Sequence, residues 1–384
     1  MFLQIHTLTS YAAGLLNRDD AGLAKRIPFG NAERMRVSSQ CLKKHWRDDF
    51  HRNLDLPGGI RSRLFFEREI LARVVEAGIN QETATKLTEA LLKRLIQGGQ
   101  KKDAPLQLNQ PVLFGKPEAD YLVSLIKECA GAESDPVKLL DERLKAEKGN
   151  LQAMWKTAGV SLVAGIEGAL FGRFVTSDIL ARTDAAVHVA HAFTVHPLAT
   201  EVDYFTVVDD LKEADEDAGA AHAGDMELGA GLFYGYIVVD VPLLVSNLCG
   251  CDPTAWKKQP KETIQDVRDV LSRLIEAIAT VSPGAKLGAT APYARAACVL
   301  LETGKTQPRT LANAYLEALK PKGNLERQAV EALGQHLAAL DAMYGREENR
   351  FVSTTVTTES LADVPRAPLK ASIAAVLDSL FGAG

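Results

Sequence analysis

The chain has 384 residues, of which 46% are hydrophobic and 24% charged, and its formal net charge is -5. This is an ordinary globular composition with enough apolar residues for a sizeable core. Five scattered cysteines argue against a disulfide framework, so we expect a reducing, cytoplasmic location. The uncharged runs are too short for a membrane span, and the N-terminus lacks the basic start of a signal peptide, so we expect neither membrane insertion nor secretion.

The first predicted element is a strand over Phe2–Leu8, where apolar and polar side chains alternate. A basic segment follows, because residues 17–47 hold eight Lys or Arg and three Asp or Glu. The serines before Gln40, and the absence of Gly and Pro after it, predict a helix from about Gln40. At about 100° per residue, one stripe of this helix carries Gln40, Lys43, Lys44 and Arg47. Arg34 and Arg36 are interpreted as flanking a turn at Met35.

Helix-like segments fill residues 63–148 and predict an all-α insertion. Strand-like segments return after it, with a helix predicted near residues 263–281. These strands are predicted over residues 165–175, 187–195, 231–239 and 293–301. The order strand, helix, strand, strand, helix, strand is that of an RRM-like (ferredoxin-like) sheet, so the predicted fold class is α+β. The C-terminal third predicts Ala- and Leu-rich helices over residues 308–320, 324–345 and 369–382.

The basic helix has two interpretations. A solvated charged face is the default for such a helix. RRM-like sheets, however, bind single-stranded RNA, and Arg18, Lys25 and Arg26 on the preceding loop would add to a phosphate-binding track. The aromatic-rich pattern of ordinary RRM strands is absent, so their stacking mode is not expected here.

A second unusual segment, residues 200–227, holds ten acids and a single Lys. Tyr204 and Phe205 lie inside it, between two predicted strands. A hairpin there would expose both rings for stacking on bases, worth about 1 to 3 kcal/mol each; the alternative is a local cluster folded back on the sheet. Phe174, beside Arg173 after a Gly turn, is either an apolar wedge between bases or a core residue.

No metal or cofactor site is expected. His188 and His191 differ by three positions and would face opposite sides of a strand, and the "CGC" at residues 249–251 is too closely spaced for a zinc knuckle. No Gly-rich phosphate loop or activated nucleophile is found. Asp19 and Asp20 could act in acid–base RNA cleavage, but acids beside arginines more often form ion pairs or caps.

Five stretches in collinear order carry a family resemblance: "LNRDD", "RVSSQCLKKHWR", "GRFVTSD", "DAAVHVAHAFTVHPLATEVDYFTVVDDL" and "SPGAK". Over roughly residues 1–300 the chain resembles the CasC family, the backbone subunit of the type I-E CRISPR Cascade surveillance complex. The resemblance implies a hand-like molecule with an RRM-like palm, an all-helical finger insertion, a thumb hairpin and C-terminal helices. The implied parts are palm strand and basic helix 1–60, fingers 61–160, palm strands 161–198, thumb 199–230, and palm remainder with C-terminal helices 231–384.

The resemblance also implies a function without catalysis. Several copies would polymerise along one CRISPR RNA, kink it at intervals and present its bases for pairing with a target DNA strand. Implied partners are CRISPR RNA, target DNA, copies of the chain itself, and the large, small and two guide-end-capping subunits. The implied RNA-binding residues are Arg18, Lys25, Arg26, Ser38, Gln40, Lys43, Lys44, Arg47, Arg173, Phe174 as the wedge, Tyr204, Phe205 and Lys286.

Three further hypotheses remain open at this stage. The acidic hairpin, including Asp215 and Asp217, would contact a neighbouring protein surface. In the first rival function, the chain would be an RNA-cleaving backbone subunit like those of type III complexes, with Asp19 or Asp20 as the catalytic acid. In the second, it would be a helix-rich interaction scaffold without RNA.

Overall fold

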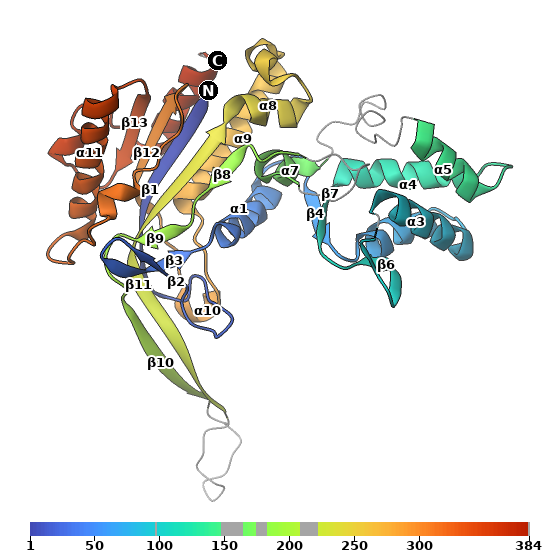
Figure 1. Ribbon diagram of the computed structural model, residues 1–384, viewed down its shortest axis with the longest axis horizontal. Helices are drawn as coiled ribbons and strands as arrows, with labels where there is room; N and C mark the ends of the chain where they lie inside the picture. Colours follow the sequence, from blue (N-terminus) through green and yellow to red (C-terminus); the bar gives the residue numbers. More distant parts are fainter. Residues whose placement is uncertain (97, 147–163, 174–182, 208–221, 383–384) are drawn as a thin grey trace, which may run out of the picture. The chain divides into compact units, whose positions relative to one another are not determined.

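A computed structural model describes residues 1–96, 98–146, 164–173, 183–207 and 222–382 (Figure 1). The chain divides into two compact units. The first, called the sheet unit, comprises residues 1–53, 189–239 and 268–384, and the second, called the helical unit, comprises residues 54–188 and 240–267. Each unit therefore collects segments that are far apart in the sequence.

The sheet unit is built on a nine-stranded sheet, with the order β13-β12-β1-β11-β9-β3-β2 and with β8 and β10 pairing to β11 off this path. Its central pairs, β1 with β12 and β11 with β9, are antiparallel. The strands are β1 (Phe2–Gly14), β2 (Arg26–Phe29), β3 (Ala32–Val37), β8 (Val187–Val189), β9 (Ala192–Thr194), β10 (Thr200–Val207), β11 (His222–Asp240), β12 (Ala296–Gly304) and β13 (Asn349–Thr354). The α+β class with a mostly antiparallel sheet is confirmed.

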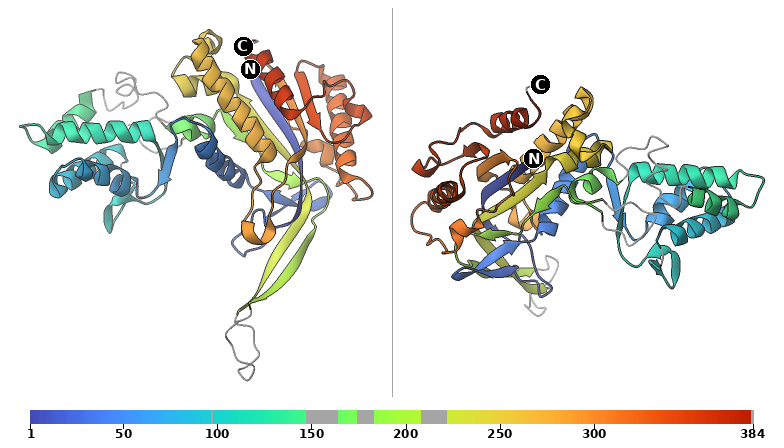
Figure 2. Two further views of the ribbon diagram at one scale, coloured as in Figure 1. Left: turned by 180° about the vertical axis from the view of Figure 1, so that it is seen from behind. Right: turned by 45° about the horizontal axis from the view of Figure 1, so that its top comes forward.

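Helices cover both faces of this sheet. The helices of this unit are α1 (Ser39–Asn53), α9 (Lys261–Thr280), α11 (Leu325–Tyr344) and α12 (Leu369–Phe381), with the four-residue α10 (Leu287–Thr290), which buries no side chain, and the short 3-10 turns η3 (Ala312–Tyr315) and η4 (Glu359–Leu361). On one face, α11 packs Val330 and Leu333 into a cluster with Leu300 of β12. On the other, Trp46 of α1 and Ile278 of α9 border a small cavity against β1 and β11. Figure 2 shows the sheet from two further directions.

This two-sided cover corrects the expectation for β1. The alternation in Phe2–Leu8 predicted one buried face, but the strand is buried on both faces from Leu3 to Thr9. Its polar side chains are satisfied internally, since His6 lies 3.1 Å from Glu302 and its Nδ1 lies 2.9 Å from the Tyr234 hydroxyl. Gln4 and His6 therefore face a hydrogen-bonded core and not solvent.

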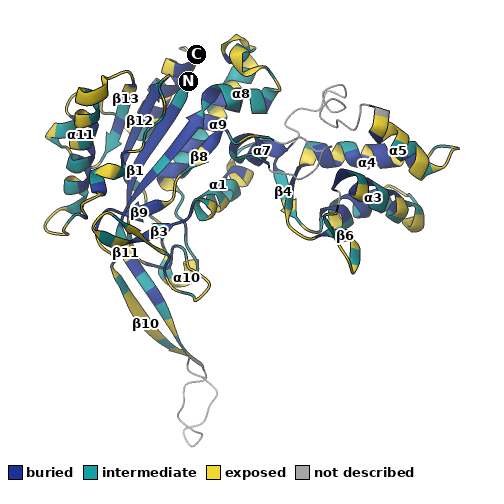
Figure 3. Ribbon diagram, in the orientation of Figure 1, coloured by how far each residue is buried: buried dark blue, intermediate teal, exposed yellow. Residues whose placement is uncertain are grey.

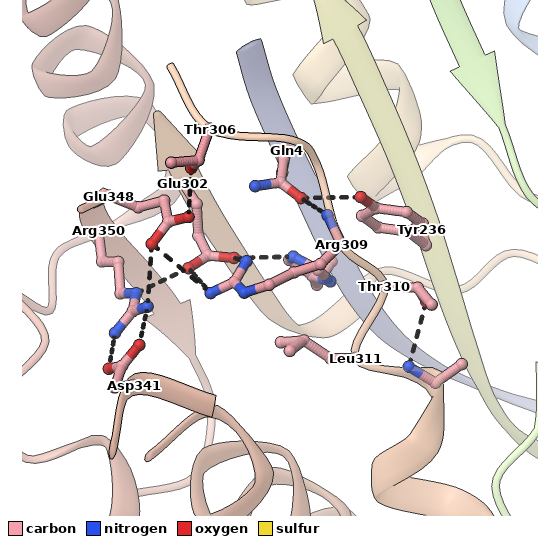
Figure 4. Close-up of polar contacts among 12 residues, drawn as sticks. Gln4, Tyr236, Glu302, Thr306, Arg309, Thr310, Leu311, Asp341, Glu348 and Arg350 are labelled. Atoms are coloured by element: carbon pink, nitrogen blue, oxygen red, sulfur yellow. Dashed lines mark hydrogen bonds and ion pairs between the residues drawn. The ribbon is translucent and has the colours of Figure 1, made fainter. Parts of the chain in front are cut away.

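Glu302 is the centre of that polar core (Figure 4). Its carboxylate accepts two hydrogen bonds from Arg309, at 2.9 and 3.0 Å, and one from Nε of Arg350 at 2.7 Å. Nη2 of Arg350 also donates to Asp341 at the end of α11, at 2.6 Å. The Gln4 side-chain oxygen accepts from the Arg309 backbone N–H at 2.9 Å. The network thus joins β1, β12, β13 and α11 at the β13 end of the sheet.

The helical unit is not all-α, which corrects the prediction for residues 63–148. It contains two two-stranded sheets, β4 (Gly59–Ser62) with β7 (Val112–Gly115) and β5 (Gln100–Lys101) with β6 (Ala104–Leu108). Its helices are η1, a π-helix (Phe65–Leu71), α2 (Ala72–Glu76), α3 (Gln81–Leu95), α4 (Lys116–Ala130), α5 (Pro136–Ala146), α7 (Gly165–Phe171), α8 (Val241–Cys249) and the 3-10 turn η2 (Pro253–Lys258). Phe65 and Phe114 stack in its core, with ring centroids 4.0 Å apart.

Three further element predictions are wrong. Residues 165–171 form a helix, because a short apolar run does not distinguish a buried strand from a buried helix. The predicted helix at 308–320 is reduced to a 3-10 turn around the buried Tyr315. The basic loop contains the hairpin β2–β3, in which Arg34 is fully buried and donates to the carbonyls of Thr194 and Tyr315 at 3.0 and 2.9 Å. Arg34 therefore does not flank a turn.

Candidate nucleic-acid interface

The N-terminus of α1 is held by Ser38, directly before it, and by Asn17 of the preceding loop. The Ser38 hydroxyl accepts a hydrogen bond from the Cys41 N–H at 3.3 Å and so acts as a helix cap. The Asn17 side chain accepts from the Ser38 N–H at 2.9 Å, and the Asn17 carbonyl accepts from the Lys25 N–H at 3.0 Å. The predicted helix start near Gln40 is thus confirmed. Ser38 is 6% exposed, so its part in the structure is to fix the start of the basic helix.

The four side chains of the stripe predicted on α1 differ in their exposure. Gln40 and Lys44 are exposed, whereas Lys43 and Arg47 are half-buried, since the helix turns Trp46 and Phe50 into the core. Burial lowers the pKa of Lys43. Lys44 forms an i,i+4 ion pair with Asp48. The four side chains lie on one helix, as predicted, and their contact with RNA stays a prediction.

The loop before α1 adds a second group of cations. Arg18 is exposed and pairs through its backbone with Ala24, and Asp19 closes the turn between them by accepting from the N–H groups of Ala21 and Leu23, at 2.9 and 3.0 Å. Asp19 therefore has the capping role considered for it. Arg26 forms an ion pair with the buried Glu227 of β11, which compensates part of its charge.

Arg36 and His191 were not among the predicted RNA-binding residues, but they belong to this group of basic residues. Nη1 of Arg36 lies 2.9 Å from Nδ1 of His191. Burial and then the positive charges of Arg36 and Lys25 lower the pKa of His191. The charges of Arg36 and Lys25, both felt by His191, mark this surface as electropositive. In the sequence, this surface was indicated only by the number of Lys and Arg residues in the basic segment. Arg36 and His191 come together because β3 and β9 pair in the sheet.

The loop at Lys286 joins the same region through β1. The Ala285 N–H donates to the Leu15 carbonyl at 3.0 Å, and the Cys41 thiol lies 3.7 Å from the next carbonyl, that of Leu16. The end of β1 thus connects the Lys286 loop to the start of α1. Lys286 itself adopts a left-handed backbone conformation with φ of 52°.

The hairpin β10–β11 carries the predicted aromatic pair and extends beyond the sheet (Figures 1 and 3). Tyr204 is 68% exposed and lines a hollow of about 460 Å³ at the base of the hairpin. Phe205 is half-buried, lies opposite Gly224, and has Nζ of Lys286 5.1 Å from its ring centroid. The hairpin itself is confirmed. Its acidic tip, including Asp215 and Asp217, lies outside the described residues.

Arg173 and Phe174 belong to the helical unit. Nη1 of Arg173 donates to both carboxylate oxygens of Glu118, at 3.0 and 2.7 Å, and the Arg173 side chain is 1% exposed. Burial raises the pKa of Glu118, while the charge and hydrogen bond of Arg173 act to lower it. Arg173 is thus a structural ion-pair partner, which corrects the prediction that it contacts RNA. Phe174, the predicted wedge, lies outside the described residues.

Metal sites and membrane spans were two further possibilities raised by the sequence. No group of three His, Cys, Asp or Glu in them could hold a metal ion. No helix in the described part of the chain is long and apolar enough to cross a membrane.

The model of the CT1975-like protein family matches residues 3–380. The chain belongs to this family. Among solved structures, this CT1975-like chain is similar to a chain of a "CRISPR RNA-guided surveillance complex, pre-nicking", with 26% identity, a TM-score of 0.83 and coverage of 99% of this chain and 100% of that one. A chain of another "CRISPR RNA-guided surveillance complex" shares the fold, with 22% identity, a TM-score of 0.61 and the same coverage. None of the curated proteins compared matches the chain. The resemblance to a subunit of a CRISPR surveillance complex is thereby confirmed.

Proposed function

We propose that this CT1975-like chain is the CRISPR RNA-binding backbone subunit of a type I-E Cascade complex. Several copies polymerise along one guide RNA, kink it at intervals and present its bases for pairing with a target DNA strand. The observation that carries the proposal is the end-to-end similarity to a chain of an RNA-guided surveillance complex. The partners are the guide RNA, target DNA, neighbouring copies, and the large, small and guide-end-capping subunits, in the cytoplasm.

The mechanism is positioning of the guide. Arg18, Lys25, Lys43, Lys44 and Arg47 neutralise guide phosphates. Arg26 contributes less because Glu227 compensates part of its charge, as Asp48 does for Lys44. Gln40 adds an uncharged hydrogen-bonding group. Tyr204, Phe205 and Lys286 meet the guide and its pairing partner at the hairpin, and Phe174 separates bases at the kink. Holding short RNA segments in order lowers the entropy cost of pairing, and base pairing, not the protein, reads the sequence.

An RRM-like palm is part of the proposal. Taking β1, β9, β11 and β12 as first to fourth in chain order, their order in the sheet is fourth, first, third, second. Helix α1 lies between the first and second of these strands in sequence, and α9 between the third and fourth. This supports a split βαβ core to which β2, β3, β10 and β13 are additions.

We propose further that the chain has no nuclease activity of its own. The hydrogen bonds of Asp19 within its turn support this part of the proposal. Asp20 is exposed and is the better candidate for the rival RNA-cleaving function. Cleavage of bound RNA by the purified complex, abolished by Asp20→Ala, would contradict the proposal.

The direct test is a double variant of α1, Lys43→Glu with Arg47→Glu. We expect guide binding to be abolished, because two attractive contacts with phosphate become repulsive, while the far-UV circular dichroism stays that of the parent. The matched control is Arg52→Glu with Arg346→Glu, at two exposed cations outside the track. Unchanged guide binding by the Lys43/Arg47 variant, or equal loss in the control, would refute the assignment of the track.

A further inference from the structure

A hollow of about 580 Å³ opens on the sheet unit between the end of α9, the strands β12 and β13, and the start of α12. Its lining contains Arg295 and Arg366, together with the hydroxyl residues Thr280, Ser353, Thr354 and Thr355. No Asp or Glu is among the lining residues. In a chain with 49 acidic and 44 basic residues, two arginines around a hollow without carboxylates point to an anionic ligand.

The two arginines differ in how they are held. Nη2 of Arg366 donates to the Thr354 carbonyl at 2.7 Å, and Nη1 donates to the Thr357 hydroxyl. This guanidinium is therefore fixed before any ligand arrives, which reduces the ordering cost of binding. Arg295 is exposed, and within the described residues its side chain forms no ion pair or hydrogen bond. Its charge is available to a ligand.

The charge at the hollow is reinforced by α12. This helix begins at Leu369, which is itself a lining residue, so the positive end of the helix dipole adds to the two guanidinium charges. Lys370, in the first turn, is exposed. A ligand with several regularly spaced negative charges would engage more of these cations than a single ion could.

An exposed aromatic residue in the segment that leads to the lining residue Arg295 narrows the class of ligand. Tyr293 is 76% exposed and lies two residues before Arg295. The same loop holds Lys286 and Ala291 in the left-handed region, at φ of 52° and 38°, a conformation that costs free energy for residues other than glycine. An exposed ring next to cations is the combination that single-stranded nucleic acids use for base stacking and phosphate contact. An acidic peptide would bind the cations but would not need the exposed ring of Tyr293.

We infer that this hollow is a second binding surface for single-stranded nucleic acid, with Arg295 and Arg366 on phosphates and Tyr293 stacked on a base. None of its lining residues belongs to the guide track along α1. The inference goes beyond the proposed function, in which guide RNA fills that track. A second strand would be held here without base pairing to the guide.

The test uses the full chain, purified with its bound RNA, and a fluorescein-labelled single-stranded DNA of 30 nucleotides with no complementarity to that RNA. We expect Arg295→Glu with Arg366→Glu to weaken DNA binding by about tenfold and to reduce the slope of log affinity against log salt concentration by about 1.4, for two lost phosphate contacts. Tyr293→Ala should weaken binding without changing the slope, because stacking releases no counterions.

The control is Lys322→Glu with Arg346→Glu, two exposed cations on the same unit that lie outside the hollow. The inference would be overturned if the Arg295/Arg366 double variant had the same DNA affinity and salt slope as the parent. It would also be overturned if the control lost affinity and slope to the same extent. A third contrary result would be a double variant that binds DNA normally but no longer binds a labelled poly-aspartate peptide, because the hollow would then be a site for acidic peptides. Should the double variant fail to fold, Arg295→Gln replaces it, since that side chain has no partner to lose among the described residues. A parent that purifies without RNA would contradict the proposed function alone, because the DNA assay still tests the hollow.

Discussion

Replacing Glu302 by Gln should be among the most destabilising single changes in the sheet unit. The carboxylate is fully buried and accepts from His6, Arg309 and Arg350. A neutral amide leaves the guanidinium of Arg350, which is 2% exposed, without its buried counter-charge on β12, and also turns an N–H₂ group toward its donors. Removing one partner of such a buried pair costs about 3 to 5 kcal/mol, against a total stability of about 5 to 15 kcal/mol for a typical domain.

The contribution of Glu302 to stability should also depend on pH. Burial acts to raise the pKa of Glu302, but the hydrogen bonds and charges of His6 and Arg309 outweigh it and hold the pKa well below its usual range. The charged carboxylate therefore contributes its full stabilisation above the unfolded pKa of about 4.3, and this contribution is lost as the pH falls toward the folded pKa. The stability difference between the parent and Glu302→Gln should accordingly shrink below about pH 4.

Urea denaturation followed by circular dichroism measures both effects. The matched control is Glu347→Gln, an exposed acid two residues before β13, which should change the free energy of unfolding by less than about 0.5 kcal/mol. A loss below about 1 kcal/mol for Glu302→Gln at pH 7, or a loss that is the same at pH 7 and pH 3, would refute the reasoning.

Three further changes have distinct expected results. Gly30→Ala should destabilise the β2–β3 turn by more than about 1 kcal/mol in thermal unfolding, because Gly30 has a φ of 61° and an added Cβ would lie 1.7 Å from the Leu316 carbonyl oxygen; an unchanged melting temperature would contradict this. Asp49→Ala should lower the free energy of unfolding by about 1 to 3 kcal/mol, because it leaves Arg273 without its partner on α1. A coupling energy of zero in a double-mutant cycle with Arg273→Ala would contradict this. Tyr204→Ala should leave stability within about 0.5 kcal/mol while weakening guide or target binding by about 1 to 3 kcal/mol in filter binding, whereas equal affinity would exclude stacking.

Much of the fold was predictable where one local signal dominated. The capping serine before Gln40, the Ala- and Leu-rich run of residues 324–345 and the acidic segment around Tyr204 between two predicted strands each indicate a local element, and α1, α11 and the hairpin agree with them. The hairpin β2–β3 was missed because its pairing is completed by β9, more than 150 residues away in the chain. Such long-range pairing overrides local pattern.

The residue types of the candidate site could be predicted from the sequence. Which of these residues are exposed, and which lie next to one another, could not. The stripe on α1 follows from helical geometry alone. The burial of Arg34 and Arg173 does not, because each is held by carbonyls or a carboxylate from distant segments that only the fold supplies. For the same reason Arg36 and His191, which lie side by side, carry no joint signal in the sequence.

The most direct test of the central claim is the length distribution of the RNA that co-purifies with the chain. The account predicts one small RNA species of uniform length in the parent, absent from the Lys43→Glu and Arg47→Glu double variant and retained in the Arg52→Glu and Arg346→Glu control. Fragments of random length in the parent, or no RNA at all, would contradict a guide-binding backbone subunit.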